Sequence, residues 1–206
     1  MNIHQHIQQQ RPYPQKLSMK TEVIFSVFIV LLGLTLGFVA KMTDSVSIIG
    51  EIGTEIGVWI FVATMIAAFS RYPFAAVINV FLFFIFALVA YYLYGNFVLG
   101  FFPRSYFYGW LIVALVSPFA GFVIWFSKAN NFVGIVISSL PVAFLFAHGF
   151  PAFYTHRLSL FLSLIMGLLC CLVLPRTVKQ KIITCAISIP IAFIFTQMDV
   201  FRFLPF

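Results

Sequence analysis

The sequence predicts an all-α protein, a polytopic bundle of transmembrane helices with about seven spans. Two observations lead to this fold class. Hydrophobic residues make up 63% of the 206-residue chain and charged residues only 8%, which is far outside the range of a soluble globular domain. Long stretches, such as 72–103, 105–127 and 129–155, contain no charged side chain. Since a helix needs about 20 mostly apolar residues to cross a bilayer, each of these stretches is long enough to span it.

The chain begins with a polar segment, 1–20, whose composition is typical of a flexible tail. The apolar block from Val23 to Ala40 is longer than the core of a secretory signal and lacks a small-x-small cleavage site, so we expect an uncleaved first span. The predicted spans are 22–40, 55–70, 74–94, 106–127, 131–149, 158–175 and 182–198. The last is the least secure because it is short and contains Thr184 and Gln197, and six spans remain if it does not cross. Residues 21–206 then form a single transmembrane domain.

Basic residues in the short loops predict the orientation, because Lys and Arg favour the cytoplasmic side. With the N-terminus inside, the cytoplasmic basic residues are Arg11, Lys16, Lys20, Arg71, Lys128, Arg176, Lys179 and Lys181. The outer ones are Lys41, Arg104, Arg157 and Arg202, and the acids Asp44, Glu51, Glu55 and Asp199 share that side. We therefore expect a multi-pass protein of a bacterial-type plasma membrane with a cytoplasmic N-terminus. The net charge of +7 follows from this topology and needs no nucleic-acid partner.

Small residues at four-residue spacing predict close contacts between helices, because they let backbones approach in lipid. Gly33 and Gly37 form such a pair in the first span, and Gly53 and Gly57 form another at the start of the second. We interpret these glycines as contacts inside the bundle. The alternative is a surface for a partner membrane protein or for a second copy of the chain.

Three prolines lie inside predicted spans, namely Pro118, Pro141 and Pro190, and each has a serine nearby. Proline removes a backbone hydrogen bond and kinks a helix. Broken or kinked helices near the middle of the membrane line the substrate sites of transporters. The prolines therefore predict a substrate cavity lined by kinks, and the alternative is that they are ordinary features of membrane helices.

Titratable residues near the outer side give the candidate ligand or ion site. If the segment from Gly50 to Gly57 is helical, Glu51 and Glu55 share one face, and Glu55 lies at the bilayer boundary, where carboxylates are costly and tend to be functional. The alternative is an amphipathic segment on the outer surface with its acids in water. His148 and Arg157 fall on the same side and complete the candidate set.

Aromatic residues flank the predicted outer loop, 95–105. They are Tyr91, Tyr92, Tyr94, Tyr106, Tyr108 and Trp110. Amphipathic rings at span ends are typical of an interfacial belt, and an aromatic ligand site is the alternative. The cysteines Cys170, Cys171 and Cys185 lie within spans without metal-site or redox spacing. Motifs of known membrane enzymes are absent from the sequence, so we predict no catalytic residue, metal site or cofactor, and we do not expect an enzyme.

The stretch Phe-Pro-Arg-Ser-Tyr-Phe-Tyr-Gly-Trp at 102–110 resembles the small uncharacterised bacterial multi-spanning membrane protein families of this length, which implies a membrane fold without a known function. In size and helix number the chain is also similar to the substrate-binding subunits of energy-coupling-factor vitamin transporters, but it has Gly33 and Gly37 in place of their alanine-spaced first-helix motif. We expect a small-molecule transporter or a membrane component of a transport assembly. The alternatives are an accessory protein that binds partner helices or lipid, and an intramembrane enzyme.

Overall fold

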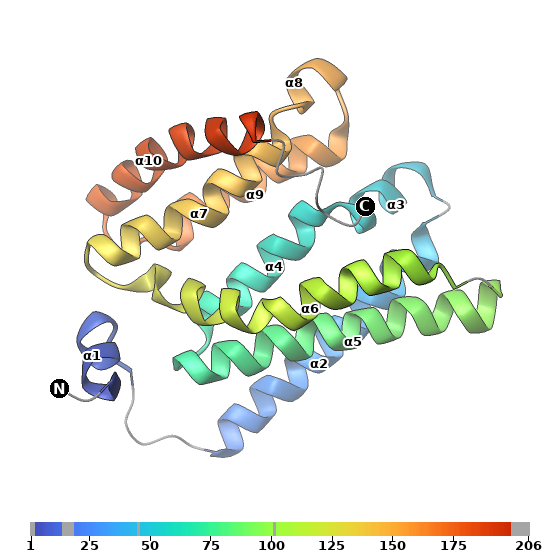
Figure 1. The fold of residues 1–206 in the computed structure, drawn as a ribbon, viewed down its shortest axis with the longest axis horizontal. Helices are drawn as coiled ribbons and strands as arrows, with labels where there is room; N and C mark the ends of the chain where they lie inside the picture. The colour runs from blue at the N-terminus through green and yellow to red at the C-terminus, as the bar shows by residue number, and fades with distance from the viewer. Residues whose placement is uncertain (1–2, 14–18, 45, 101, 199–206) are drawn as a thin grey trace.

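The computed structural model describes residues 3–13, 19–44, 46–100 and 102–198, and the secondary structure of these residues is entirely helical (Figure 1). The elements are α1 (Ile3–Gln10), α2 (Met19–Thr43), α3 (Ser47–Thr54), α4 (Ile56–Phe69), α5 (Pro73–Leu99), α6 (Arg104–Trp125), the 3₁₀ turn η1 (Phe126–Lys128), α7 (Phe132–Gly149), α8 (Ala152–Thr155), α9 (Leu158–Val173) and α10 (Val178–Gln197). Lys16, Asp199 and Arg202, which entered the predicted orientation, lie outside the described residues.

Each of the seven predicted ranges contains a helix, but within the part of the chain that the structure describes five helical segments are long and apolar enough to cross a membrane. They are Met19–Thr43, Pro73–Leu99, Arg104–Lys128, Phe132–Thr155 and Val178–Gln197. The helices α4 and α9 are apolar but have only 14 and 16 residues. At about 1.5 Å per residue both fall short of a hydrocarbon core of about 30 Å. The prediction of seven spans is therefore not confirmed, and the short helices are the second and sixth rather than the doubted last one.

Local signals in the sequence explain where several helices begin and end. Pro73 occupies the first turn of α5, where its missing N–H costs nothing, and Gly100 ends that helix in the left-handed conformation with φ of 66°. The Asn131 side chain accepts a hydrogen bond from the Gly134 backbone at the start of α7. A reciprocal capping box between Thr177 and Gln180 starts α10, and such a box satisfies two backbone donors at a helix start.

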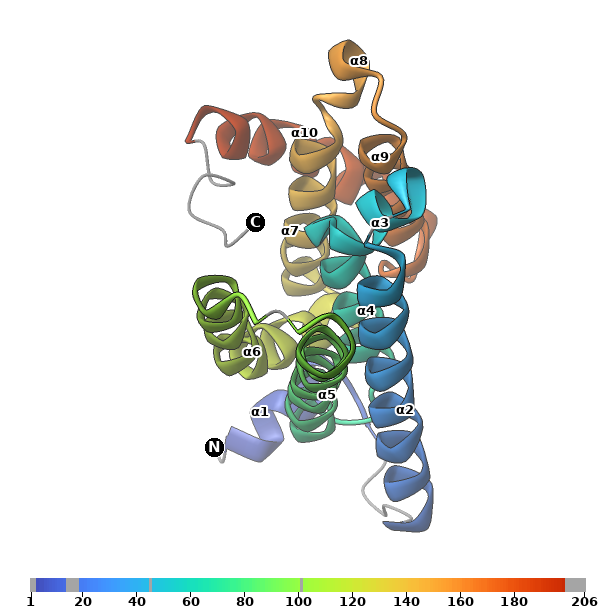
Figure 2. The same ribbon diagram turned by 90° about the vertical axis from the view of Figure 1, so that its right-hand side faces the viewer.

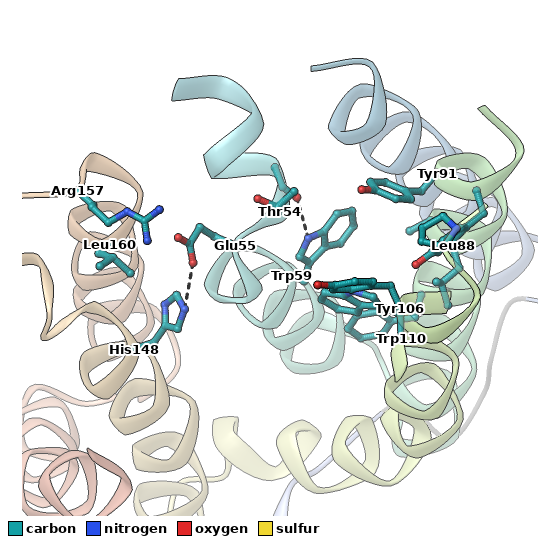
Figure 3. A pocket seen from close by; sticks show the side chains of 15 residues that line it. Thr54, Glu55, Trp59, Leu88, Tyr91, Tyr106, Trp110, His148, Arg157 and Leu160 are labelled. Atoms are coloured by element: carbon teal, nitrogen blue, oxygen red, sulfur yellow. Dashed lines mark hydrogen bonds and ion pairs between the residues drawn. The ribbon is translucent and has the colours of Figure 1, made fainter. Parts of the chain in front are cut away.

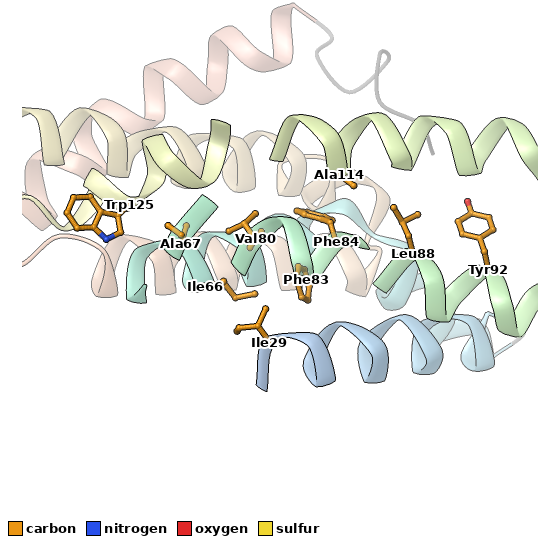
Figure 4. Packing of buried hydrophobic residues seen from close by; sticks show 12 residues of the cluster. Ile29, Ile66, Ala67, Val80, Phe83, Phe84, Leu88, Tyr92, Ala114 and Trp125 are labelled. Carbon is orange, nitrogen blue, oxygen red and sulfur yellow. The ribbon is translucent and has the colours of Figure 1, made fainter. Parts of the chain in front are cut away.

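The helices form two groups with α4 between them. One group contains α2, α5 and α6, the other contains α7, α9 and α10, and α4 contacts helices of both groups (Figures 1 and 2). Ala67 of α4 belongs to the hydrophobic cluster of the first group, which runs along α5 and includes Phe83 and Ala114 (Figure 4). Its neighbour Ala68 belongs to the second cluster, with Leu145. The short helix α4 is thus the element that joins two separate cores.

The predicted small-residue pairs lie where helices approach closely. A Cβ added at Gly33 would lie 2.6 Å from the carbonyl oxygen of Phe83, and one added at Gly37 would lie even closer to the carbonyl oxygen of Ala87. The helices α2 and α5 therefore cross with their backbones nearly in contact. At Gly53, an added Cβ would lie 3.2 Å from the Cα of Ala40, which brings α3 against the end of α2.

The three predicted prolines all lie inside helices: Pro118 in α6, Pro141 in α7 and Pro190 in α10. Pro118 cannot supply the backbone donor that normally reaches Ala114. The hydroxyl of Ser117 donates to that carbonyl oxygen at 2.8 Å instead, as expected for a proline tolerated in a membrane helix.

The segment 1–20, predicted as a flexible tail, contains a helix in its described part. Residues 3–10 form α1, and the Arg11 side chain is buried at the ends of α4 and α6, where it donates to the carbonyl oxygens of Trp125 and Ala68. Carbonyls in the last turn of a helix lack intrahelical donors and attract cations, which explains why the Arg11 guanidinium lies here. Burial, with a contribution from Arg176, lowers the pKa of Arg11 to about 10, so the guanidinium stays charged at neutral pH.

Candidate functional site

A pocket of about 600 Å³ opens between the two helix groups, and we call the end of the bundle where it lies the pocket end. Its lining combines apolar and aromatic side chains with Glu55, His148 and Arg157. Pockets of about 300–1,000 Å³ with mainly apolar walls and a few placed polar groups are typical of small-molecule sites. Figure 3 shows Glu55, His148 and Arg157 on one side of the pocket and Trp59, Tyr106 and Trp110 on the other.

Glu55 lies at the break between α3 and α4. Its backbone is extended, with φ of −69° and ψ of 124°, so the segment from Gly50 to Gly57 is not one continuous helix. The prediction that Glu51 and Glu55 share one helix face is therefore not correct, because the chain changes direction between them. Both side chains nevertheless reach the start of α9, where Arg157 pairs with Glu51 and Ser159 with Glu55.

Both carboxylate oxygens of Glu55 have a partner. The Nε2 atom of His148 lies 3.1 Å from Oε2, and the hydroxyl of Ser159 donates to Oε1 at 3.1 Å. On the far side of the imidazole, Nδ1 lies 3.1 Å from the hydroxyl of Ser163. His148, Ser159 and Ser163 are all buried, so a chain of polar groups runs from the pocket wall into the group formed by α7 and α9.

Burial raises the pKa of Glu55, but hydrogen bonds from His148 and Ser159 and the charges of His148 and Arg157 outweigh it, so the pKa is lowered overall. Glu55 is therefore a carboxylate at neutral pH and accepts a hydrogen bond from Nε2–H of His148. When His148 is neutral, Nδ1 is the acceptor and the Ser163 hydroxyl the donor. The protonation state of one imidazole thus sets the charge of the whole cluster.

The described carboxylates differ in the kind of partner they have. Glu22 lies 3.6 Å from Arg71, Asp44 lies 2.6 Å from Lys41, and Glu51 lies 2.6 Å from Arg157, so each of these acids pairs with Arg or Lys. Glu55 pairs instead with His148. Histidine is the side chain whose ordinary pKa puts its charge change near physiological pH. Within the described residues, Glu55 is therefore the only carboxylate whose partner becomes positively charged by gaining a proton.

The aromatic side of the pocket is also fixed by polar contacts. The Tyr91 hydroxyl donates to Asp44 Oδ2 at 3.0 Å, while the Nζ atom of Lys41 lies 4.8 Å from the centroid of the same ring. The indole of Trp59 donates to the carbonyl oxygen of Gly53 at 3.0 Å, and its centroid lies 6.3 Å from that of Trp110. Rings held in this way present fixed faces to the pocket.

The structure brings together most of the titratable residues predicted from the sequence. Glu55, His148 and Arg157 line the pocket. Glu51 does not line it but forms an ion pair with Arg157. Of the six aromatics assigned to an interfacial belt, four line the pocket and two do not. The lining ones are Tyr91, Tyr92, Tyr106 and Trp110. The prolines Pro118, Pro141 and Pro190 are not among the lining residues, so this pocket is not the cavity that they predicted.

Sequence reasoning missed Trp59, Ser159 and Ser163. A signal for the serines was present, since residues four apart share a helix face, and Ser159 and Ser163 interrupt an otherwise apolar face of α9. Gly57, predicted as a packing residue, lies beside this cluster, where an added Cβ would come within 3.3 Å of His148 Nδ1. Close approach of α4 to α7 and α9 is thus what assembles the cluster.

Ser163, His148 and Glu55 form a Ser–His–acid chain, which in hydrolases activates the serine as a nucleophile. Here the serine hydroxyl is fully buried behind the imidazole and does not line the pocket. The Ser163 hydroxyl is therefore placed to orient the His148 ring and not to attack a substrate in the pocket. Among the described residues no group of three or more His, Cys, Asp or Glu side chains is placed to hold a metal ion.

No protein-family model matches the chain, and neither does any curated protein or solved structure. The residues of the pocket are therefore the basis on which its function is inferred.

Proposed function

We propose that the protein is a small-molecule carrier of the membrane, or the ligand-binding membrane component of a transport assembly, and that its ligand occupies the pocket between the two helix groups. The observation that carries this proposal is the pocket itself. It is large enough for a small organic molecule, it has apolar walls, and its few polar groups converge on the Glu55–His148 pair.

The position of the pocket between two separately packed groups supports a carrier. Each group has its own hydrophobic cluster, and the short helix α4 is the main element that joins them. Movement of one helix group against another around a fixed site is how many transporters alternate the access of a ligand. At the opposite end the buried Arg11 bridges α4 and α6, so in this conformation access lies on the pocket side.

The orientation is part of the proposal. The described basic residues at the end opposite the pocket include Arg11, Arg71, Lys128, Arg176 and Lys181. The positive-inside rule places that end in the cytoplasm and the pocket on the outer side of a bacterial-type plasma membrane. The ligand then enters from outside.

A panel experiment tests ligand binding. The thermal stability of the purified full-length protein is measured with organic cations, organic anions and neutral compounds. A ligand of the pocket raises the midpoint, and substituting Thr54→Trp should abolish that rise, because exposed Thr54 lines the pocket and an indole there fills it. The control Thr155→Trp places the same indole on an exposed position of α8 that does not line the pocket.

Uptake into proteoliposomes then separates carriage from binding alone. For a carrier, the ligand found by the panel accumulates or exchanges across the membrane, and Thr54→Trp slows it while Thr155→Trp does not. Binding without uptake favours the alternative, an accessory protein whose apolar pocket holds a ligand or a lipid chain. Binding that is insensitive to Thr54→Trp contradicts the pocket as the site.

A further inference from the structure

Among the charged residues that line the pocket and their ion-pair partners, one carboxylate has no partner of fixed charge. The pairs Lys41–Asp44 and Arg157–Glu51 are each neutral, and both join a fixed cation to an acid at 2.6 Å. Glu55, with neutral His148, adds one negative charge at the pocket wall, and its side chain is only 15% exposed. A carboxylate withdrawn from water without a fixed counter-charge attracts a cation.

The wall opposite Glu55 consists of aromatic faces. Tyr106 and Trp110 of α6 lie across the pocket from Glu55, and Trp59, one turn along α4 from Glu55, lies beside them (Figure 3). The faces of Trp and Tyr rings attract an ammonium group within about 6 Å, and such rings are the usual recognition element for quaternary ammonium ions. One ring of this pocket already makes such a contact, because the Lys41 ammonium lies over Tyr91.

We propose that the ligand is a monovalent organic cation, an amine or quaternary ammonium ion with apolar substituents, held between Glu55 and the aromatic wall in competition with a proton on His148. This inference rests on the proposed carrier function and names its substrate class. Two features of the geometry distinguish a cation from an anion. The guanidinium of Arg157 is already engaged by Glu51, and among the described lining residues Glu55 is the carboxylate whose partner is a histidine rather than a fixed cation.

Competition with a proton follows from the Glu55–His148 contact. When His148 gains a proton from the outer solution, the imidazolium neutralises Glu55 at 3.1 Å and the pocket no longer attracts a cation. When a cation binds, its charge favours loss of that proton to water, so one positive charge replaces another. This exchange is the coupling step of a cation–proton antiporter.

Other charged or titratable groups around the pair also act on its charge. Glu51 and Arg157 flank it from α3 and the start of α9, Lys41 and Asp44 from the end of α2, and Tyr91 and Tyr106 from α5 and α6. The two flanking ion pairs contribute no net charge, and a neutral tyrosine hydroxyl contributes none. Arg104 at the start of α6 adds one fixed positive charge at this end. Protonation of His148 therefore changes the charge of the Glu55–His148 pair by one against a fixed background.

Calorimetric titration of the full-length protein in lipid nanodiscs tests the inference with three probes of similar size: benzyltrimethylammonium, neutral N,N-dimethylbenzamide and the anion phenylacetate. The cation should bind about tenfold more tightly than the other two, a ratio typical of one well-placed charge contact. Glu55→Gln should weaken the cation about tenfold and leave the neutral probe unchanged. Tyr106→Leu should weaken the cation about threefold, whereas Tyr108→Leu, an equally exposed change on the same helix outside the pocket, should have no effect.

Acidification provides a second readout that does not depend on the folding of Glu55→Gln. Cation affinity should fall about tenfold from about pH 8 to about pH 5.5, and His148→Gln should remove that dependence. Equal binding of the neutral or anionic probe, absence of cation binding, or pH-independent cation affinity overturns the inference. The carrier proposal survives these results if another ligand from the wider panel is blocked by Thr54→Trp, and it fails together with the inference if cation binding ignores that substitution.

Discussion

The two ends of the bundle use polar side chains in different ways. At the end opposite the pocket, Arg11 donates to the carbonyl oxygens of Trp125 and Ala68, and its guanidinium lies 4.3 Å from the centroid of the Trp125 ring. The Trp125 indole in turn donates to the carbonyl oxygen of Ser70 at 2.9 Å. We call this the Arg11 end. Here one charge that is fixed at neutral pH satisfies backbone acceptors and closes the space between helices.

At the pocket end the polar contacts join side chains to side chains and leave a cavity between the helix groups. Glu55 pairs with His148, and the hydroxyls of Ser159 and Ser163 contact the two side chains from α9. A fixed positive charge at the C-terminal ends of two helices holds those ends together. A titratable pair beside a cavity instead changes its charge when it gains or loses one proton. The Arg11 end therefore closes the space between helices with a fixed charge, whereas the pocket end keeps a cavity beside a pair of titratable side chains.

The largest expected effect concerns which end faces the cytoplasm, because the outcome is all or none. In intact cells, with native cysteines replaced by alanine, an impermeant maleimide should label Thr43→Cys at the pocket end and leave Thr177→Cys at the Arg11 end unlabelled. The reason is the excess of basic residues near Thr177. Both sites should react after the cells are permeabilised, and labelling of Thr177→Cys in intact cells reverses the assignment of the two ends.

The next largest effect is on the scaffold that holds the two ends apart. Gly37→Leu should lower the free energy of unfolding by about 3 kcal/mol or more, because the new side chain meets the backbone of Ala87 and forces α2 from α5. Gly33→Leu should act similarly against Phe83. Leu31→Phe is the control, since Leu31 is exposed on the same helix and exchanges one apolar surface for another. Equal thermal stability of all three variants in detergent contradicts the close crossing.

The sequence predicted the scaffold well because membrane spans and close helix contacts have local signatures. Charge-free stretches located every main helix, and Gly33 and Gly37 marked the positions where α2 meets α5. The spans at α4 and α9 were predicted slightly too long, as 55–70 against Ile56–Phe69 and as 158–175 against Leu158–Val173. Hydropathy depends on composition alone, so it does not show where the backbone hydrogen bonds of a helix end.

The site was predicted in part, for a different reason. Glu55 was chosen because a carboxylate at the edge of the bilayer is costly, and His148 because it is a titratable residue on the same predicted side. Their pairing across 93 positions depends on how α4 packs against α7, which no local pattern encodes. Arg11 was missed for a related reason: its partners are backbone carbonyls, which are present at every position and leave no residue signature.

Removing the Arg11 side chain should have an intermediate effect on the free energy of unfolding. Arg11→Ala should lower the free energy of unfolding by about 2–3 kcal/mol, because it leaves two carbonyls without a donor and removes the contact with the Trp125 ring. Arg11→Lys should recover only part of the loss, since an ammonium cannot reach both acceptors with the geometry of a guanidinium. Thermal unfolding in detergent measures both, and Lys20→Ala, an exposed change at the start of α2, is the control. A loss no greater than that of Lys20→Ala contradicts the closing role.

The smallest expected effect is at the pocket end, and it depends on pH. Because the pKa of Glu55 is lowered in the folded protein from an ordinary value of 4.5, the carboxylate contributes stability above about that pH, and the contribution is lost as the pH falls through the folded pKa. Glu55→Gln should therefore lower the free energy of unfolding by about 1.5 kcal/mol at neutral pH, as for one hydrogen bond to a charged group. The gap between wild type and variant should narrow on acidification below about pH 4.5. Glu51→Gln should have a smaller effect, because Arg157, its partner, is 58% exposed and water replaces the lost contact. Unfolding midpoints of wild type and Glu55→Gln are measured from neutral to acidic buffer. If the difference between them does not change with pH, the Glu55 side chain stabilises the fold by its shape and not by its charge.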